Sequence, residues 1–174
     1  MTTNAEPRLS NRLYDKPTVL SVVATSKCNL DCSFCGGAYY MNREDSPREF
    51  QRERILEALE ANPTITEIQW TGGEPLLATR KIEAFVDELK VIRPEVKHQL
   101  YTNGLKMRKS HLPLLKQFDN VYVSIDGFKS SERPFMRFID EGCYEALETI
   151  YELDNVQTWG VLTRDRLGDK RWHE

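Results

Sequence analysis

Short apolar runs alternate with longer amphipathic stretches along most of this chain. The apolar runs are rich in Val, Ile, Tyr and Trp and are bounded by turn-forming residues, which is typical of buried strands. We expect five such strands, at residues 18–25, 67–71, 98–102, 121–125 and 156–163. The stretches between them are long enough for helices.

Four of these stretches carry apolar residues at helical spacing. The first helix is expected to begin near Ser46, a candidate N-cap, with Pro47 in its first turn. The other three are expected at residues 81–92, 109–118 and 144–153. The pattern therefore predicts strands and helices in alternation.

This alternation implies right-handed βαβ units and a parallel sheet. A complete eight-stranded barrel needs about 250 residues, whereas this chain has 174. The predicted fold class is therefore α/β, a partial, open TIM-like (β/α)5–6 barrel with parallel strands. We expect residues 1–15 to form a polar N-terminal segment and residues 16–174 to form one core domain that stops soon after its fifth strand.

Composition narrows the class of protein. With 40% hydrophobic residues, the chain can build one globular core. Its net charge of −3 gives no electrostatic support for binding nucleic acid. No run approaches the roughly 18 to 20 apolar residues that span a bilayer, and residues 1–17 lack the apolar core of a signal peptide. We expect a cytoplasmic protein with no nucleic-acid or membrane partner.

Three cysteines, Cys28, Cys32 and Cys35, follow the first predicted strand within eight residues. The fourth, Cys143, lies more than a hundred residues later and is interpreted as an ordinary packed residue. Crowding of this kind favours a metal site in a reducing compartment over a disulfide framework. An iron–sulfur cube normally takes four protein thiolates, so a set of three leaves one iron open to another ligand.

Two alternatives to a cluster remain open on spacing alone. One is a structural zinc site, although zinc usually takes four protein ligands. His98, His111 and His173 are scattered along the chain and are expected on the surface. The other alternative is a set of unliganded thiols.

Further polar and glycine-rich segments follow the next three strands. In parallel α/β folds, ligand sites gather at the carboxyl ends of the strands, so these segments are expected to meet at one edge. The candidate residues there are Gly72, Gly73, Glu74 and Pro75 after the second strand, Thr102 and Asn103 after the third, and Ser124 and Asp126 after the fourth.

Each of these segments also has an ordinary structural interpretation. Glycines let the backbone approach a ligand, and either Glu74 or nearby carbonyls could receive an ammonium group, but the segment is also a helix-initiating turn. Ser124 and Asp126 alternate on one predicted strand and so are expected to share a face, where they could bind a sugar hydroxyl pair. Asn-Gly and Asp-Gly are also common turn dipeptides. Arg133 and Arg137 could each bind a carboxylate or simply be solvated.

Together these residues resemble the radical S-adenosylmethionine (SAM) superfamily over residues 18–163. The spacing of the three cysteines, with Phe34 before the last, is similar to the family's cluster loop. The Gly-Gly-Glu-Pro segment resembles its motif for the methionine amino group. Thr102 and Asn103 match a common segment after strand three, Ser124 and Asp126 resemble the ribose-contacting segment, and Arg137 lies near an arginine that several members place on the methionine carboxylate.

The resemblance implies two cofactors, a [4Fe–4S] cluster on Cys28, Cys32 and Cys35 and S-adenosyl-L-methionine on the open iron. It implies an enzyme, of oxidoreductase or activase type, that reductively cleaves SAM to a 5′-deoxyadenosyl radical. That radical would abstract hydrogen from a substrate that the sequence does not identify. An electron donor such as flavodoxin or ferredoxin would be a partner.

A short, open barrel encloses a small molecule poorly, which favours a peptide or partner protein as substrate. A glycyl-radical-enzyme activating protein is the second hypothesis within this class. A non-catalytic iron–sulfur or zinc-binding module is the rival from another class.

Overall fold

A computed structural model of the chain describes residues 16–36, 50–127 and 132–161. Five parallel strands form one sheet within these residues, in the order β1-β2-β3-β4-β5. Their bounds are Val19–Thr25 for β1, Glu67–Gly72 for β2, Lys97–Thr102 for β3, Asn120–Ser124 for β4 and Val156–Trp159 for β5. The predicted fold class, an open parallel α/β sheet, is confirmed.

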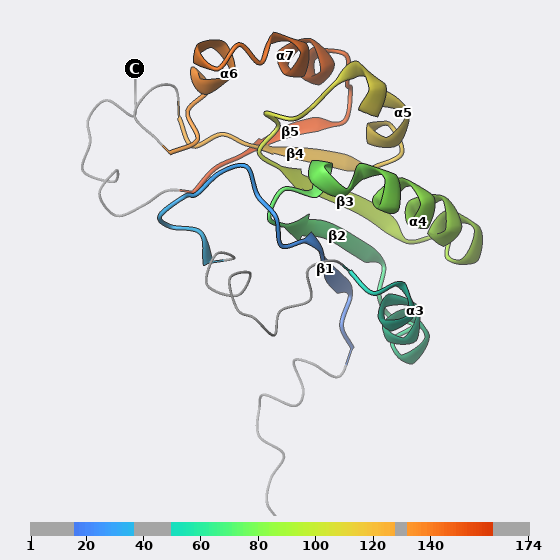
Figure 1. Cartoon of the computed structure of the whole chain (residues 1–174). Coiled ribbons are helices and arrows are strands. Elements are labelled where there is room, and N and C mark those ends of the chain that lie inside the picture. Colours follow the sequence, from blue (N-terminus) through green and yellow to red (C-terminus); the bar gives the residue numbers. More distant parts are fainter. Residues whose placement is uncertain (1–15, 37–49, 128–131, 162–174) are drawn as a thin grey trace, which may run out of the picture.

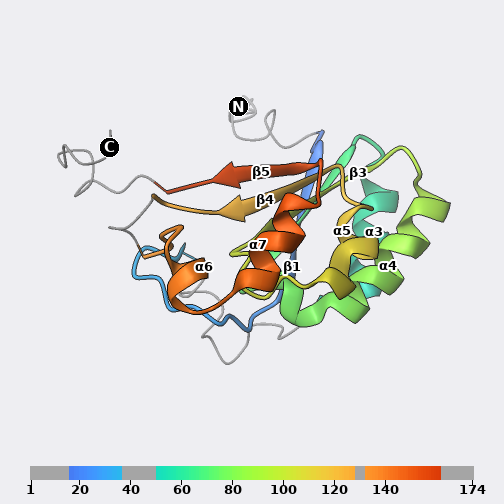
Figure 2. The same cartoon turned by 90° about the horizontal axis from the view of Figure 1, so that it is seen from above.

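The helices cover one face of this sheet (Figures 1 and 2). They are α3 (Arg52–Ala61), α4 (Thr79–Ile92), α5 (Leu112–Leu115), α6 (Arg137–Asp140) and α7 (Tyr144–Tyr151), with 3-10 turns η1 (Pro75–Ala78) and η2 (Lys109–His111). The other face carries no helix among the described residues. No helix in this part of the chain is both long and apolar enough to cross a bilayer.

Alternation along the strands explains this one-sided core. On β2, Ile68 and Trp70 are fully buried, and the Trp70 ring packs edge-on against Phe85 of α4 at 6.2 Å. Gln69 and Thr71 point to the opposite, open face. A parallel sheet covered on both faces would be apolar on both, whereas here the open face mixes polar residues such as Gln69 and Thr71 with aromatic ones such as Tyr101 and Trp159.

Two of the predicted helices differ from the observed ones by more than two residues at one end. The helix expected at residues 109–118 is a 3-10 turn followed by the short α5, which ends at Leu115. The Asn155 side chain donates to the carbonyls of Leu115 and Phe118, which satisfies these groups without a longer helix. The helix expected from Ser46 corresponds to α3, which begins at Arg52, and the candidate cap Ser46 and Pro47 lie outside the described residues.

The expectation that His98 is a surface residue is wrong. Its side chain is fully buried, and its Nδ1 accepts a hydrogen bond from Trp70 Nε1 at 3.2 Å. Burial lowers the pKa of His98 to about 4, so the ring is neutral at pH 7 and keeps the lone pair that Trp70 requires.

Candidate functional site

A cavity of about 350 Å³ opens at the carboxyl ends of the strands. All five strands and the loop after β1, here called the cysteine loop (residues 26–36), contribute to its wall. The lining residues that the sequence predicted are Cys28, Cys32, Cys35, Gly72, Gly73, Thr102, Asn103 and Ser124. The expected meeting of separate segments at one edge is therefore present in the structure.

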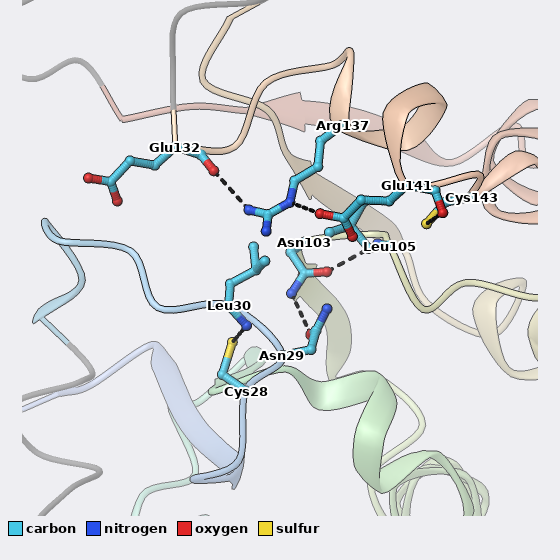
Figure 3. A network of polar contacts seen from close by, with 9 residues as sticks. All are labelled: Cys28, Asn29, Leu30, Asn103, Leu105, Glu132, Arg137, Glu141 and Cys143. Carbon is cyan, nitrogen blue, oxygen red and sulfur yellow. Dashed lines mark hydrogen bonds and ion pairs between the residues drawn. The ribbon is translucent and has the colours of Figure 1, made fainter.

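The three cysteines of the loop are free thiols that face this one cavity. Cys35 N donates to Cys32 O at 3.0 Å, which closes a turn between these two ligand candidates. Cys28 Sγ accepts from Leu30 N at 3.4 Å (Figure 3). Burial raises the pKa of the Cys28 and Cys32 thiols. Both are therefore protonated until a metal takes the place of the proton.

The number of thiols bears on the kind of metal group. A structural zinc ion usually takes four protein ligands, all about 2.0–2.3 Å from one ion. A cube instead distributes its thiolates over separate irons. The described wall of the cavity carries three thiols, which suit a cube with one open iron.

A glycine turn (residues 72–75) packs against the start of the cysteine loop. Gly73 N donates to Thr25 O at 2.8 Å, and Glu74 N donates to Lys27 O at 2.7 Å. A Cβ on Gly73 would lie 2.1 Å from the Lys27 carbonyl oxygen. Gly72 has φ +125°, which L side chains rarely adopt. Both positions therefore require glycine for structural reasons while their backbone faces the cavity.

We expect Gly73→Ala to damage the cysteine loop. The added methyl must push the Lys27 backbone away, at a cost of about 2 kcal/mol or more in unfolding free energy, and cluster loading should fall with it. Urea unfolding and iron content per chain measure both effects. Gly36→Ala is the matched control, since its Cβ would meet nothing within 4 Å. Equal behaviour of the two variants would contradict this account.

Glu74 does not line the cavity. Its carboxylate is fully buried and accepts from Leu76 N at 3.0 Å, Thr102 Oγ1 at 2.6 Å and Asn103 N at 2.8 Å. Burial raises the pKa of this carboxyl, and the three hydrogen bonds oppose the rise. Of the two groups considered for an ammonium ligand, the backbone of the glycine turn faces the cavity and the carboxylate does not. Pro75 is also buried, at the start of η1.

Thr102 and Asn103 line the cavity but also hold its wall together. Asn103 Nδ2 donates to Asn29 Oδ1 at 2.9 Å, which ties the end of β3 to the cysteine loop (Figure 3). Asn103 Oδ1 accepts from Leu105 N at 3.1 Å. Their side chains are therefore largely committed to the protein.

The expectation that Ser124 and Asp126 share one strand face is wrong. β4 ends at Ser124, which lines the cavity. Asp126 lies beyond the strand and is 1% exposed. Its carboxylate accepts from Arg133 Nε at 2.8 Å, from Arg133 Nη2 at 2.7 Å and from Val161 N at 2.8 Å. The strong bidentate pair with arginine draws this side chain out of the cavity wall.

The arginine at the cavity wall is Arg133, not Arg137. Arg137 binds the Glu141 carboxylate and donates to Glu132 O at 3.1 Å (Figure 3). The Arg133 guanidinium lies 4.9 Å from the centre of the Phe34 ring, so it covers one face of that ring. The sequence named both Arg133 and Arg137 as candidates but gave no signal for choosing between them. Asp126, the partner of Arg133, was instead expected to bind a sugar.

Sequence reasoning missed the part of the cavity that lies on the open face of the sheet. These lining residues are Ser21, Gln69, Thr71, Tyr101 and Trp159. The Tyr101 ring stacks on Tyr122 at 4.7 Å, and Trp159 meets Tyr101 edge-on at 6.0 Å. Alternation could have found them, because they occupy the strand positions that the buried core residues leave to the other face.

The chain resembles known proteins in sequence. The family model described as Radical SAM superfamily matches residues 22–161. GTP 3′,8-cyclase of Mycobacterium marinum is 34% identical over 122 residues, which cover 68% of this chain and 34% of that protein. GTP 3′,8-cyclase of Streptomyces coelicolor is 30% identical over 113 residues, covering 63% and 33%. The chain thus spans about a third of the length of these relatives.

Solved structures share the fold. anSMEcpe with bound AdoMet superposes with a TM-score of 0.66 at 20% identity, covering 88% of this chain and 46% of that one. BtrN in complex with AdoMet and 2-DOIA gives a TM-score of 0.59 at 19% identity, covering 82% and 56%. The family match spans most of the chain, and it agrees with the cysteine loop and the open parallel sheet. The chain therefore belongs to the radical SAM superfamily, whose members bind a [4Fe–4S] cluster and SAM.

Proposed function

We propose that Cys28, Cys32 and Cys35 hold a [4Fe–4S] cluster and that SAM binds beside it in the same cavity. The observation that carries the proposal is that three free thiols and the glycine turn face one cavity at the carboxyl ends of the strands. The cofactors supply reductive cleavage of SAM and a 5′-deoxyadenosyl radical that abstracts hydrogen from a substrate. The electron comes from a donor of flavodoxin or ferredoxin type.

The chain's own residues bind and orient these groups. The thiolates hold the cluster. The backbone of the glycine turn faces the same cavity, and it lies close to the Lys27 carbonyl because Gly73 has no side chain. The Ser124 hydroxyl offers a donor and an acceptor to a ligand. Along the open face, Gln69, Tyr101 and Trp159 form a further part of the cavity wall. This surface gives the substrate a place beside SAM.

We favour a peptide or protein substrate. Arg133 is the one cation of the described cavity wall, and Asp126 already neutralises it through two hydrogen bonds. A nucleoside triphosphate would need further cations, since phosphate recognition relies on Arg and Lys. A polar and aromatic open face instead suits an extended chain. A structure with the same fold, anSMEcpe, has been solved with a bound peptide.

A purine nucleotide is the second candidate substrate. The supporting observation is the 34% identity to a GTP 3′,8-cyclase over 122 residues. This likeness favours nucleotide chemistry over the glycyl-radical-activating role considered from the sequence. In either case, we propose a reducing, cytoplasmic setting, since the ligand cysteines must remain free thiols.

Anaerobic reconstitution tests the core of the proposal. We expect about four irons and four sulfides per chain, and reduction in the presence of SAM should release 5′-deoxyadenosine, measured by chromatography and mass spectrometry. Iron loading without that product would overturn catalysis in favour of a non-catalytic module. Bound zinc without sulfide would overturn the cluster itself.

The substrate classes separate in the same assay. If the second candidate holds, GTP should be consumed along with SAM, and deuterium placed on its ribose should appear in 5′-deoxyadenosine. GTP that has no effect on product formation would remove that candidate. Deuterium transfer from a supplied peptide would support the first.

A further inference from the structure

The centre of the cysteine loop is tied to the segment that follows β4. Ser33 N donates to Glu132 Oε2 at 2.6 Å, and Ser33 Oγ donates to the other oxygen of the same carboxylate. Ser33 lies between two of the ligand candidates, Cys32 and Cys35. One carboxylate thus receives two charge-assisted hydrogen bonds at the middle of the loop; both are exposed, so water screens part of their strength.

The neighbouring residue makes a second tie. Arg133 lies over the Phe34 ring, where a guanidinium is attracted to the negative ring face. Asp126 fixes Arg133 in place, and the side chains of this ion pair are only 15% and 0% exposed. A bidentate pair that is this buried holds its geometry, unlike a surface ion pair.

The Asp126 carboxylate also connects the cysteine loop to the segment that follows β5. Asp126 Oδ1 also accepts from Val161 N, which lies just beyond β5. A continuous line of contacts therefore runs from the cysteine loop through Arg133 and Asp126 to the chain that leaves β5. Within the loop itself, Cys35 N to Cys32 O is a single turn-closing backbone bond. Contacts to other elements therefore contribute strongly to its shape.

We propose that Glu132 and Arg133 are positioning residues that hold the cysteine loop ready for its cluster before the cluster binds. The proposal rests on the proposed function, because it assigns the loop to a cluster. Its physical basis is preorganisation, since a loop already held in place loses less conformational entropy when its thiolates are fixed. Neither residue needs to touch the cluster for this role.

Hydrogen exchange in the apoprotein tests directly whether the cysteine loop is held in place. Glu132→Ala removes both hydrogen bonds from Ser33, so we expect the hydrogen-bonded loop amides of Leu30 and Cys35 to exchange about tenfold faster. Glu88→Ala is the control, because it removes a hydrogen-bonded carboxylate on α4, whose partner Arg52 lies on α3 far from the loop (Figure 1). Unchanged exchange in the loop, or an equal change in the control, would overturn the proposal.

Two further readouts separate positioning from general stability. After reconstitution, Glu132→Ala and Arg133→Ala should both lose iron to a chelator about tenfold faster than the unmodified chain. Glu132 and Arg133 carry opposite charges, so a purely electrostatic role would shift the cluster's reduction potential in opposite directions and leave exchange unaltered. That second pattern would contradict positioning. Glu132→Gln keeps one acceptor oxygen and should partly rescue the loop.

A double variant tests whether Glu132 acts through Ser33. If it does, Ser33→Ala combined with Glu132→Ala should change exchange no more than Glu132→Ala alone. Fully additive effects would show that Glu132 does not act through the Ser33 hydroxyl, since the Ser33 N–H remains in Ser33→Ala. Should the reconstituted chain fail to cleave SAM, the proposed function falls, while exchange in the apoprotein still decides whether the loop is held.

Discussion

Replacement of Cys32 by Ala is expected to abolish cluster assembly and SAM cleavage. Only three thiols face the cavity within the described residues, so the variant leaves two ligands for four irons. Loss of an outer partner of a metal ligand costs up to about 100-fold, and loss of a ligand itself should exceed that. Iron content and 5′-deoxyadenosine formation after anaerobic reconstitution measure the effect.

The fold should survive this substitution. Cys32 lies on a surface loop. Its backbone carbonyl accepts a hydrogen bond from Cys35 N, and this bond remains in the alanine variant. The unfolding free energy should therefore change by no more than about 0.5 kcal/mol. Loss of the cluster together with loss of the fold would point to a structural role for the thiol instead.

Cys143→Ala is the matched control for the cysteine variants. Cys143 precedes α7, its Sγ contacts the Glu141 carbonyl, and it does not line the cavity (Figure 3). The variant should load the same iron and cleave SAM at the same rate as the unmodified chain. A complete cluster in Cys32→Ala, or a lost one in Cys143→Ala, would refute the ligand assignment.

The fold and the position of Cys32 could be predicted because both depend on patterns between residues that are close in sequence. Strand and helix periodicity predicted the parallel sheet, and the sheet in turn brings loops from separate strands to one edge. The cysteines lie within a single loop, so their spacing alone placed them together. This explains why the fold and the candidate ligands could be found without a structure.

The choice of partner for each polar side chain is not local. Glu74 meets Thr102 and Asn103, which lie 28 and 29 positions away along the chain. Asp126 turns toward Arg133 and Val161, which lie in segments after β4 and β5. Sequence pattern predicted that these residues reach the correct edge, but which of them turn into the cavity depends on such distant partners. A polar residue after a strand therefore predicts that the residue lies at the carboxyl edge of the sheet, but not whether its side chain faces the cavity.

Glu74→Ala should cause a large loss of stability. The carboxylate is fully buried and receives hydrogen bonds from Leu76, Thr102 and Asn103. Its removal leaves these three donors unpaired beside a new void, a change that costs about 3–5 kcal/mol when one partner of a buried charged network is deleted. Urea unfolding of the apoprotein measures this cost without any contribution from the cluster. Glu53→Ala, at a side chain that is 74% exposed, should change stability by less than about 0.5 kcal/mol.

The pH dependence of the same variant series tests the state of the carboxyl. Burial raises the pKa of Glu74 in the folded chain above its ordinary value of 4.5. Between 4.5 and that raised value, the folded state keeps a proton that the unfolded state has released, so this group's contribution to stability falls as pH rises through the window. Glu74→Gln cannot titrate there. The stability of the unmodified chain relative to Glu74→Gln should therefore decline from acid toward neutral pH and then level off. A relative stability that instead increases with pH would show that the three hydrogen bonds outweigh burial and hold the carboxylate ionised.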